Sequence, residues 1–261
     1  MPYDLLGLNH KLRKQIANKI IEYIVRGLSL APHGIGGFNV CPEATPACMQ
    51  ACVLWYTGRT VTRIVREAMV RRKMLLVENP ELFHKQFYAD IRTHIRKAAR
   101  EGLIPLLRPN VASDLDWRQV AKDFPSLGMY DYTKVRSRMR EVLDGKWPSN
   151  YELTYSCNER SHHRTVGSYL RNGLNVAVVF STRYHPQSGR IDPLPKTYCI
   201  DGKEWEVINA DEHDMRLRKL DGSGVITGLR FKGSLKRRAA AIQGGFCIDV
   251  DAKDYRGEVA A

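Results

Sequence analysis

Residues 151–180 read YELTYSCNERSHHRTVGSYLRNGLNVAVVF, and this stretch decides the expected fold. It holds two apolar, strand-like runs, Tyr151–Ser156 and Leu174–Phe180, separated by a helical pattern over His162–Arg171. A strand, a helix and a second strand in succession predict a βαβ unit, in which the two strands pair in parallel.

The same alternation continues outward on both sides of this unit. The further strand candidates are Leu28–Pro32, Leu103–Leu107, Gly128–Tyr132, Trp205–Ile208 and Val225–Phe231, and further helical patterns cover Asp116–Phe124 and Val135–Leu143. About seven strands alternating with helices predict an α/β fold. The chain length suits a single (β/α) barrel-like domain, which we expect to be partial or irregular.

Helical patterns also precede this alternation. Residues 9–26 carry isoleucines at helical spacing before Gly27, and two long helices are expected over Thr60–Val77 and Pro80–Arg100. Residues 182–204, rich in Pro and Gly, predict a loop. The expected organisation is one domain over 1–261, with an N-terminal helix over 1–26, a barrel-like core over 28–233 that contains a cysteine loop over 34–58, and a C-terminal segment over 234–261.

Composition limits the class of protein. No apolar run approaches the roughly 20 residues that a membrane span needs, and no secretory signal opens the chain, so a cytoplasmic location is expected. The net charge of +13 favours anionic substrates and leaves non-specific nucleic-acid binding open. The basic runs at Lys11–Lys14, Arg71–Lys73 and Lys236–Arg238 are also typical of solvated helix faces, and no recognisable nucleic-acid module accompanies them.

Three of the six cysteines lie within twelve positions, in Cys41-Pro-Glu-Ala-Thr-Pro-Ala-Cys48-Met-Gln-Ala-Cys52. A helical turn that begins near Pro46 would place Cys48 and Cys52 on one face, and a Pro-bounded loop allows Cys41 to fold back toward it. Three thiolates that converge in this way predict a metal centre, whereas the alternative is a set of ordinary core cysteines.

Soft thiolate ligands select zinc, copper(I) or iron–sulfur clusters. Structural zinc usually takes four ligands, and no second cysteine pair follows here, so a 4Fe-4S cluster is expected. Three cysteines leave one iron without a thiolate, and that iron can bind a small ligand. The spacing differs from the radical S-adenosylmethionine signature, in which the cysteines are three and then two residues apart, so the same chemistry is not implied by the motif.

Several short motifs resemble the phage protein family called gene product 88. The residues that carry the resemblance are Cys41-Pro42, Ala44-Thr45, Cys48, Cys52, Gly58-Arg59, Tyr132-Thr133-Lys134, Asn150, Leu153-Thr154-Tyr155-Ser156, Asp211 and His213-Asp214. The resemblance extends from Leu28 to about Gly233. It implies a viral or prophage origin and an iron–sulfur centre, and it supplies no reaction.

Polar residues follow the ends of the predicted strands, which in a (β/α) barrel is where the chemistry lies. Lys134 is a candidate for binding a carboxylate or acting as a base, and Arg108 is a candidate clamp for a carboxylate or phosphate. His213, between Asp211 and Asp214, is a candidate acid or base. The alternative is structural pairing of Arg108 with Asp114 and of His213 with Asp214.

The fourth cluster ligand has three candidates, because Cys157 and His33 both follow predicted strands and a small ligand or a vacant position is equally compatible. The sequence thus predicts an iron–sulfur enzyme that acts on a small anionic metabolite, for example a lyase that removes sulfide from cysteine. The two rival hypotheses are a radical S-adenosylmethionine enzyme and a non-catalytic cluster protein that binds nucleic acid or a host partner.

Overall fold

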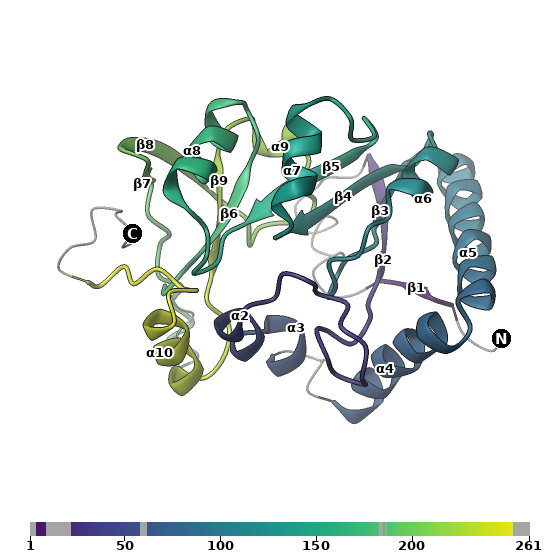
Figure 1. Ribbon diagram of the computed structural model, residues 1–261, viewed down its shortest axis with the longest axis horizontal. Helices are drawn as coiled ribbons and strands as arrows, with labels where there is room; N and C mark the ends of the chain where they lie inside the picture. The colour runs from purple at the N-terminus through teal and green to yellow at the C-terminus, as the bar shows by residue number, and fades with distance from the viewer. Residues whose placement is uncertain (1–3, 9–21, 58–61, 183–184, 186, 253–261) are drawn as a thin grey trace.

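A computed structural model of the chain describes residues 4–8, 22–57, 62–182, 185 and 187–252 (Figure 1). The strands within these residues are β1 (Leu6–Gly7), β2 (Tyr23–Leu28), β3 (Ile104–Arg108), β4 (Gly128–Thr133), β5 (Tyr151–Ser156), β6 (Val176–Phe180), β7 (Thr197–Ile200), β8 (Lys203–Asn209) and β9 (Ile226–Arg230). The helices are α2 (Pro46–Gln50), α3 (Val53–Tyr56), α4 (Arg63–Glu78), α5 (Pro80–Glu101), α6 (Arg118–Asp123), α7 (Arg136–Leu143), α8 (His163–Arg171), α9 (Arg218–Asp221) and α10 (Leu235–Gln243).

The described strands form one nine-stranded sheet in the order β1-β2-β3-β4-β5-β6-β9-β8-β7. Strands β2 to β6, β9 and β8 run parallel, whereas β1 and β7 pair antiparallel with β2 and β8. The predicted mixed α/β class is therefore confirmed. No pairing joins β1 to β7 among the described residues, so the sheet is open there and closure into a barrel stays a prediction.

The two faces of the sheet are buried by different elements. Leu107 and Met129 point to the face where α5, α6, α7 and α8 contribute Phe87, Val120 and other apolar side chains to the main core. Leu106 and Tyr130, one position away along β3 and β4, point to the opposite face and pack with Met215 and Leu217. Successive residues of a strand face opposite sides, so β3 and β4 bury apolar side chains on both faces and show no alternating pattern there.

The secondary structure predicted for residues 22–32 was wrong. Tyr23–Leu28 is the strand β2, not the end of a helix, and Leu28–Pro32 is not a strand. The run Tyr23-Ile-Val is buried on both faces, and a short continuous apolar run does not distinguish a buried strand from a helix by its periodicity. Residues 9–21 of the predicted helix lie outside the described residues.

Downstream, the predicted elements from α4 to β6 agree with the structure to within about three residues. Several elements, among them β1, α3 and α9, were not predicted. The expected loop over 182–204 contains β7, and the C-terminal segment contains α10, which packs against α2. In Figure 1, α2, α3, α4 and α10 lie together along the lower edge of the molecule.

Candidate functional site

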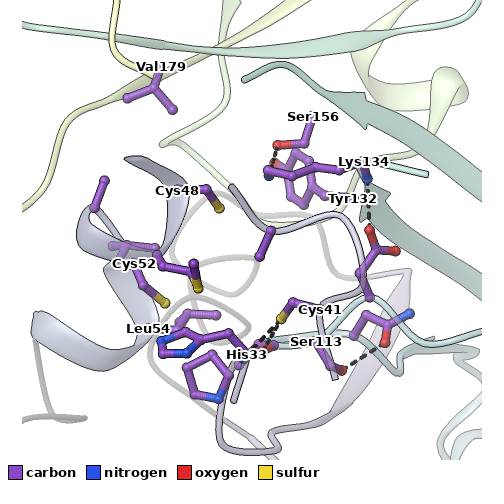
Figure 2. Close-up of a pocket in the computed structure, with 18 of the residues that line it drawn as sticks. His33, Cys41, Cys48, Cys52, Leu54, Ser113, Tyr132, Lys134, Ser156 and Val179 are labelled. Carbon is purple, nitrogen blue, oxygen red and sulfur yellow. Dashed lines mark hydrogen bonds between the residues drawn. The ribbon is translucent and has the colours of Figure 1, made fainter. Parts of the chain in front are cut away.

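A cavity of about 220 Å³ opens at the carboxyl ends of the parallel strands (Figure 2). Neighbouring strands contribute side chains to its wall, among them Arg108 from β3, Tyr132 from β4, Ser156 from β5, Val179 from β6 and Leu229 from β9. The strand register places these five residues on the same face of the sheet. Some of the polar residues that follow the predicted strands, Arg108 among them, thus line this one cavity.

The three clustered cysteines line the same cavity. Cys48 lies in α2, which begins at Pro46 as expected, because Thr45 caps the helix by accepting a hydrogen bond from the Cys48 backbone N–H. The helix ends at Gln50, so Cys52 is not on it and instead precedes α3. The predicted single helical face for Cys48 and Cys52 is therefore wrong, although both residues still reach the cavity.

Cys41 is held by its neighbours in the loop after β2. Its Sγ accepts a hydrogen bond from the backbone N–H of His33 at 3.2 Å and lies 3.6 Å from the carbonyl oxygen of Ala112. The glycine loop allows this approach, since Gly36 and Gly37 have φ values of 80° and 100°. The loop therefore folds Cys41 back toward Cys48 and Cys52 (Figure 2).

Burial raises the pKa of the Cys41 thiol to about 11 and that of the Cys52 thiol to about 12. The thiols also influence one another, because Cys48 raises both of these values and Cys41 raises that of Cys52. Nucleophilic cysteines typically have lowered pKa values, whereas these two are protonated thiols at neutral pH unless a metal displaces the protons. The environment suits metal ligands better than a catalytic nucleophile.

No group of three His, Cys, Asp or Glu side chains within the described ranges sits at the spacing needed to hold one metal ion. A single ion requires its ligands to converge on one point. The ligands of a cubane cluster need not converge on one point, because each cysteine binds a different iron and the cysteine sulfur atoms therefore lie farther apart. Cys41, Cys48 and Cys52 all line one cavity, as such a cluster would require of its ligands.

Lys134 occupies the part of the wall beyond the cysteines. Its Nζ donates a hydrogen bond to Ser156 Oγ at 2.7 Å, and its backbone N–H donates to Asp114 at 2.8 Å. The Lys134 ammonium lies close enough to Cys41 to lower the pKa of that thiol. A cation and a hydroxyl therefore face the same space as the thiols.

Arg108 is buried, with 6% of its surface exposed, and its Nη1 donates to both carboxylate oxygens of Asp214 at 2.7 and 2.6 Å. Burial alone lowers the pKa of Arg108, but Asp214 together with Tyr130, Tyr132 and Asp131 more than offsets this and the net shift is upward. The Arg108 Nε and the Tyr132 hydroxyl are buried and have no hydrogen-bond partner in the described part of the chain. Unpartnered buried polar atoms are uncommon, and here they lie beside the cavity.

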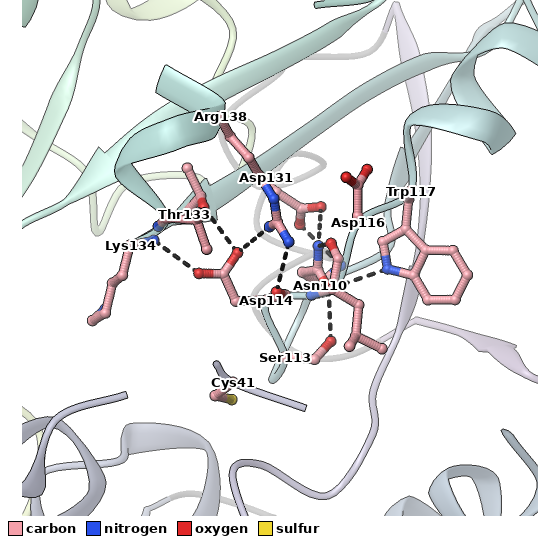
Figure 3. A network of polar contacts seen from close by, with 12 residues as sticks. Cys41, Asn110, Ser113, Asp114, Asp116, Trp117, Asp131, Thr133, Lys134 and Arg138 are labelled. Atoms are coloured by element: carbon pink, nitrogen blue, oxygen red, sulfur yellow. Dashed lines mark hydrogen bonds and ion pairs between the residues drawn. The ribbon is translucent and has the colours of Figure 1, made fainter. Parts of the chain in front are cut away.

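The structural pair expected between Arg108 and Asp114 is absent. Asp114 instead accepts hydrogen bonds from Arg138 and Thr133, as Figure 3 shows. In the same network, Asp131 is fully buried and accepts from the Tyr151 hydroxyl and from Asn110. These bonds fix the loop after β3, which forms one side of the cavity.

Two predicted catalytic residues lie elsewhere. Neither Asp211 nor His213 lines the cavity. Asp211 stands behind it and binds Lys232 at 2.6 Å, whereas His213 contacts Arg216 through Nδ1 at 3.0 Å. His213 Nε2 also lies 3.9 Å from the buried Asp221, and burial lowers the pKa of His213 while the charge of Asp214 opposes this shift. The segment after β8 continues to Met215 and Leu217, which pack with Leu106 and Tyr130 of the sheet.

The two protein candidates for a fourth ligand are separated. His33 lines the cavity with the three cysteines. Cys157 lines a smaller, neighbouring cavity with Val166, Tyr198 and Phe246. Burial raises the pKa of the Cys157 thiol to about 12.

Lys73 was seen in the sequence only as part of a basic run, and it is fully buried. Its Nζ reaches from α4 to the carbonyl oxygens of His33 and Ile35 at 2.7 and 2.5 Å. Burial lowers the pKa of Lys73, and the nearby Cys41 thiol opposes this shift. No periodic pattern marks such a residue, because its partners are backbone atoms about 40 positions away.

Replacing Lys73 with methionine is expected to lower the free energy of unfolding by about 2 kcal/mol, since two buried carbonyl groups lose a charged donor. Chemical denaturation of Lys73→Met and of the wild type measures this difference. Arg71→Met, on the exposed side of the same helix, is the matched control and is expected to change stability by less than about 0.5 kcal/mol. Equal effects of the two substitutions would contradict the role assigned to Lys73.

Comparison with known proteins supplies a family. A family model described as Gene product 88 matches residues 5–250. No curated protein and no solved structure shows a significant match. The structure also contains, within its described helices, none long and apolar enough to cross a membrane.

Proposed function

The chain belongs to the gene product 88 family, and since that name states no reaction, we propose from the cavity itself that the protein is an iron–sulfur enzyme. In this proposal Cys41, Cys48 and Cys52 hold a 4Fe-4S cluster, and a small anionic metabolite binds beside it. The observation that carries the proposal is that the three cysteines share one cavity with Lys134 and Arg108.

Positively charged and hydrogen-bond-donating side chains at the cavity wall are the reason for proposing an anionic substrate. The Lys134 ammonium and Ser156 hydroxyl form a donor pair within 2.7 Å of each other, and such a pair suits a carboxylate. The Arg108 charge is balanced by Asp214, and its Nε, which has no hydrogen-bond partner in the described chain, lies 4.0 Å from Asp131. When bound, the cluster supplies a Lewis-acidic iron that carries no cysteine ligand.

The reaction we propose is the elimination of sulfide from a thiol-bearing amino acid such as cysteine. The substrate loses its Cα proton, the Cβ–S bond breaks, and hydrosulfide leaves. The resulting enamine then reacts with water to give pyruvate and ammonia, so no oxidant or reductant is consumed. Lys134 and Ser156 would hold the substrate carboxylate at the wall of the cavity.

The decisive experiment is anaerobic purification with iron and sulfide analysis and EPR spectroscopy. We expect a brown protein with about four irons and four sulfides per chain, which releases sulfide and pyruvate from L-cysteine in a steady-state assay. A colourless protein that contains zinc or no metal would refute the cluster. A brown protein that is inert toward L-cysteine would retain the cluster and refute the proposed reaction.

The rival enzyme is one that uses S-adenosylmethionine in radical chemistry. It is favoured by the position of the cysteine loop directly after β2, the first parallel strand in the chain, at the carboxyl ends of the sheet. It is disfavoured by the cysteine spacing. Binding of S-adenosylmethionine and its cleavage after reduction of the cluster distinguish it from the lyase.

The non-catalytic alternative has less support. A closed, structural cluster would favour Cys157 as a fourth thiolate, and Cys157 lies in the neighbouring cavity. The net charge of +13 is the observation that favours nucleic acid as a partner. Steep weakening of DNA or RNA binding with rising salt concentration would support that alternative.

A further inference from the structure

His33 carries a buried imidazole nitrogen that nothing in the described chain satisfies. Its Nε2 is shielded from solvent and has no hydrogen-bond partner among the described residues. A buried polar atom without a partner costs about 1–3 kcal/mol, and a bound ion or ligand is one arrangement that would satisfy it. The same residue lines the cavity that the three cysteines line.

The backbone of His33 is held in an unfavourable conformation. Its φ of 39° lies in the left-handed region, which residues other than glycine rarely adopt. Three contacts hold it there: Lys73 Nζ and the backbone N–H of Val40 donate to its carbonyl oxygen, and its own N–H donates to Cys41 Sγ. Strain that the surrounding structure maintains in this way tends to occur at functional sites.

The backbone contact with Cys41 ties the position of the imidazole to that of a cysteine. His33 and Cys41 cannot move independently, because the N–H···S bond joins the two ends of the glycine loop. Figure 2 shows the His33 side chain on the same side of the cavity as Cys41 and Cys52. The rival donor Cys157 has no comparable link and lines the other cavity.

We propose that His33, through Nε2, is the fourth protein ligand of the cluster held by Cys41, Cys48 and Cys52 when no anion is bound. This inference rests on the proposed function and specifies how the site is closed at rest. An imidazole is a neutral ligand that an anion can replace more readily than it can replace a thiolate. The His33 imidazole therefore occupies the fourth coordination position of the cluster until an anionic substrate replaces it.

The test is pulsed EPR on the anaerobically purified, reduced protein, with nitrogen hyperfine coupling as the readout. We expect the wild type labelled with ¹⁵N-histidine to show the strong coupling of a directly bound imidazole nitrogen. His33→Asn removes the imidazole and keeps a residue that tolerates a positive φ, and this coupling is expected to disappear. Most of the iron should remain, because the three thiolates are intact.

Two further variants keep the result interpretable. His33→Gly adopts the same backbone conformation without strain and substitutes for the asparagine variant if that protein does not fold. His163→Asn changes a histidine that lines the neighbouring cavity and is expected to retain the coupling. A wild-type cluster without histidine coupling, or a coupling that survives in His33→Asn, would overturn this inference and leave the cluster itself established. A wild type without any cluster would overturn the proposed function and this inference together.

Discussion

Cys48→Ala is expected to abolish the iron–sulfur cluster, lowering the iron content of anaerobically purified protein by at least about tenfold. Cys48 is anchored at the start of α2 by the Thr45 cap and supplies one of the three thiols of the cavity. Two remaining cysteines do not hold a cubane cluster stably, and metal binding is coupled to folding. Iron and sulfide analysis, together with the thermal unfolding midpoint, measures both consequences.

The chain offers matched controls for this experiment. Cys199 lies on β7, away from the cavity, so Cys199→Ala should retain full iron content. Cys157→Ala removes the cysteine of the neighbouring cavity and is expected to retain the cluster as well. If Cys157→Ala loses as much iron as Cys48→Ala, Cys157 is a ligand and the assignment of His33 is wrong.

Asp214→Asn is expected to destabilise the fold by about 3–5 kcal/mol, because it removes the closer of the two carboxylates that face the buried Arg108 charge, the other being Asp131 at 4.0 Å. Both side chains of the pair are almost completely buried, and Arg108 Nη1 contacts both carboxylate oxygens. The amide retains the size of the carboxylate, so the loss reports charge rather than packing. Urea denaturation followed by circular dichroism gives the difference in the free energy of unfolding.

An exposed ion pair provides the comparison. Glu22 and Lys219 lie 3.4 Å apart with well over half of each side chain exposed, so Glu22→Gln should cost less than about 1 kcal/mol. Asp214→Asn should also weaken binding of the anionic substrate, since Asp214 holds Arg108 at the cavity wall. Equal effects of the two substitutions on stability would show that the buried Arg108–Asp214 pair stabilises the fold no more than an exposed ion pair does.

Helix starts in this chain were predictable from the sequence, whereas some buried strands were not. The helix starts at Pro46 and Pro80 were predictable because a proline acts locally at the first turn, and Thr45 and Asn79 cap these helices in the structure. β2 was mistaken for helix because both of its faces are buried, so its apolar run carries no periodicity of two. β7 was hidden in a segment that pattern alone described as a loop.

Some residues of the candidate site were likewise recognisable in the sequence, and others were not. The three cysteines were recognisable from their spacing, and Arg108 and Lys134 from their positions after strands, because parallel strands bring their carboxyl ends to one edge. Lys73 was not recognisable as part of the site, since it acts on backbone carbonyl groups of a distant loop. The catalytic role of His213 stays a prediction, and the structure places this residue outside the cavity wall, against Arg216 and Asp221.

By itself, the sequence determined the alternation of strands and helices, the cysteine group and the excess of positive charge, which all depend on residue type and spacing along the chain. Only the tertiary structure decided that the sheet is open among the described strands, that His33 and not Cys157 shares the cavity of the cysteines, and that Asp214 partners Arg108. The physical reason is that such contacts join residues up to about a hundred positions apart. Their distances depend on how whole strands and loops pack, and no local pattern encodes that packing.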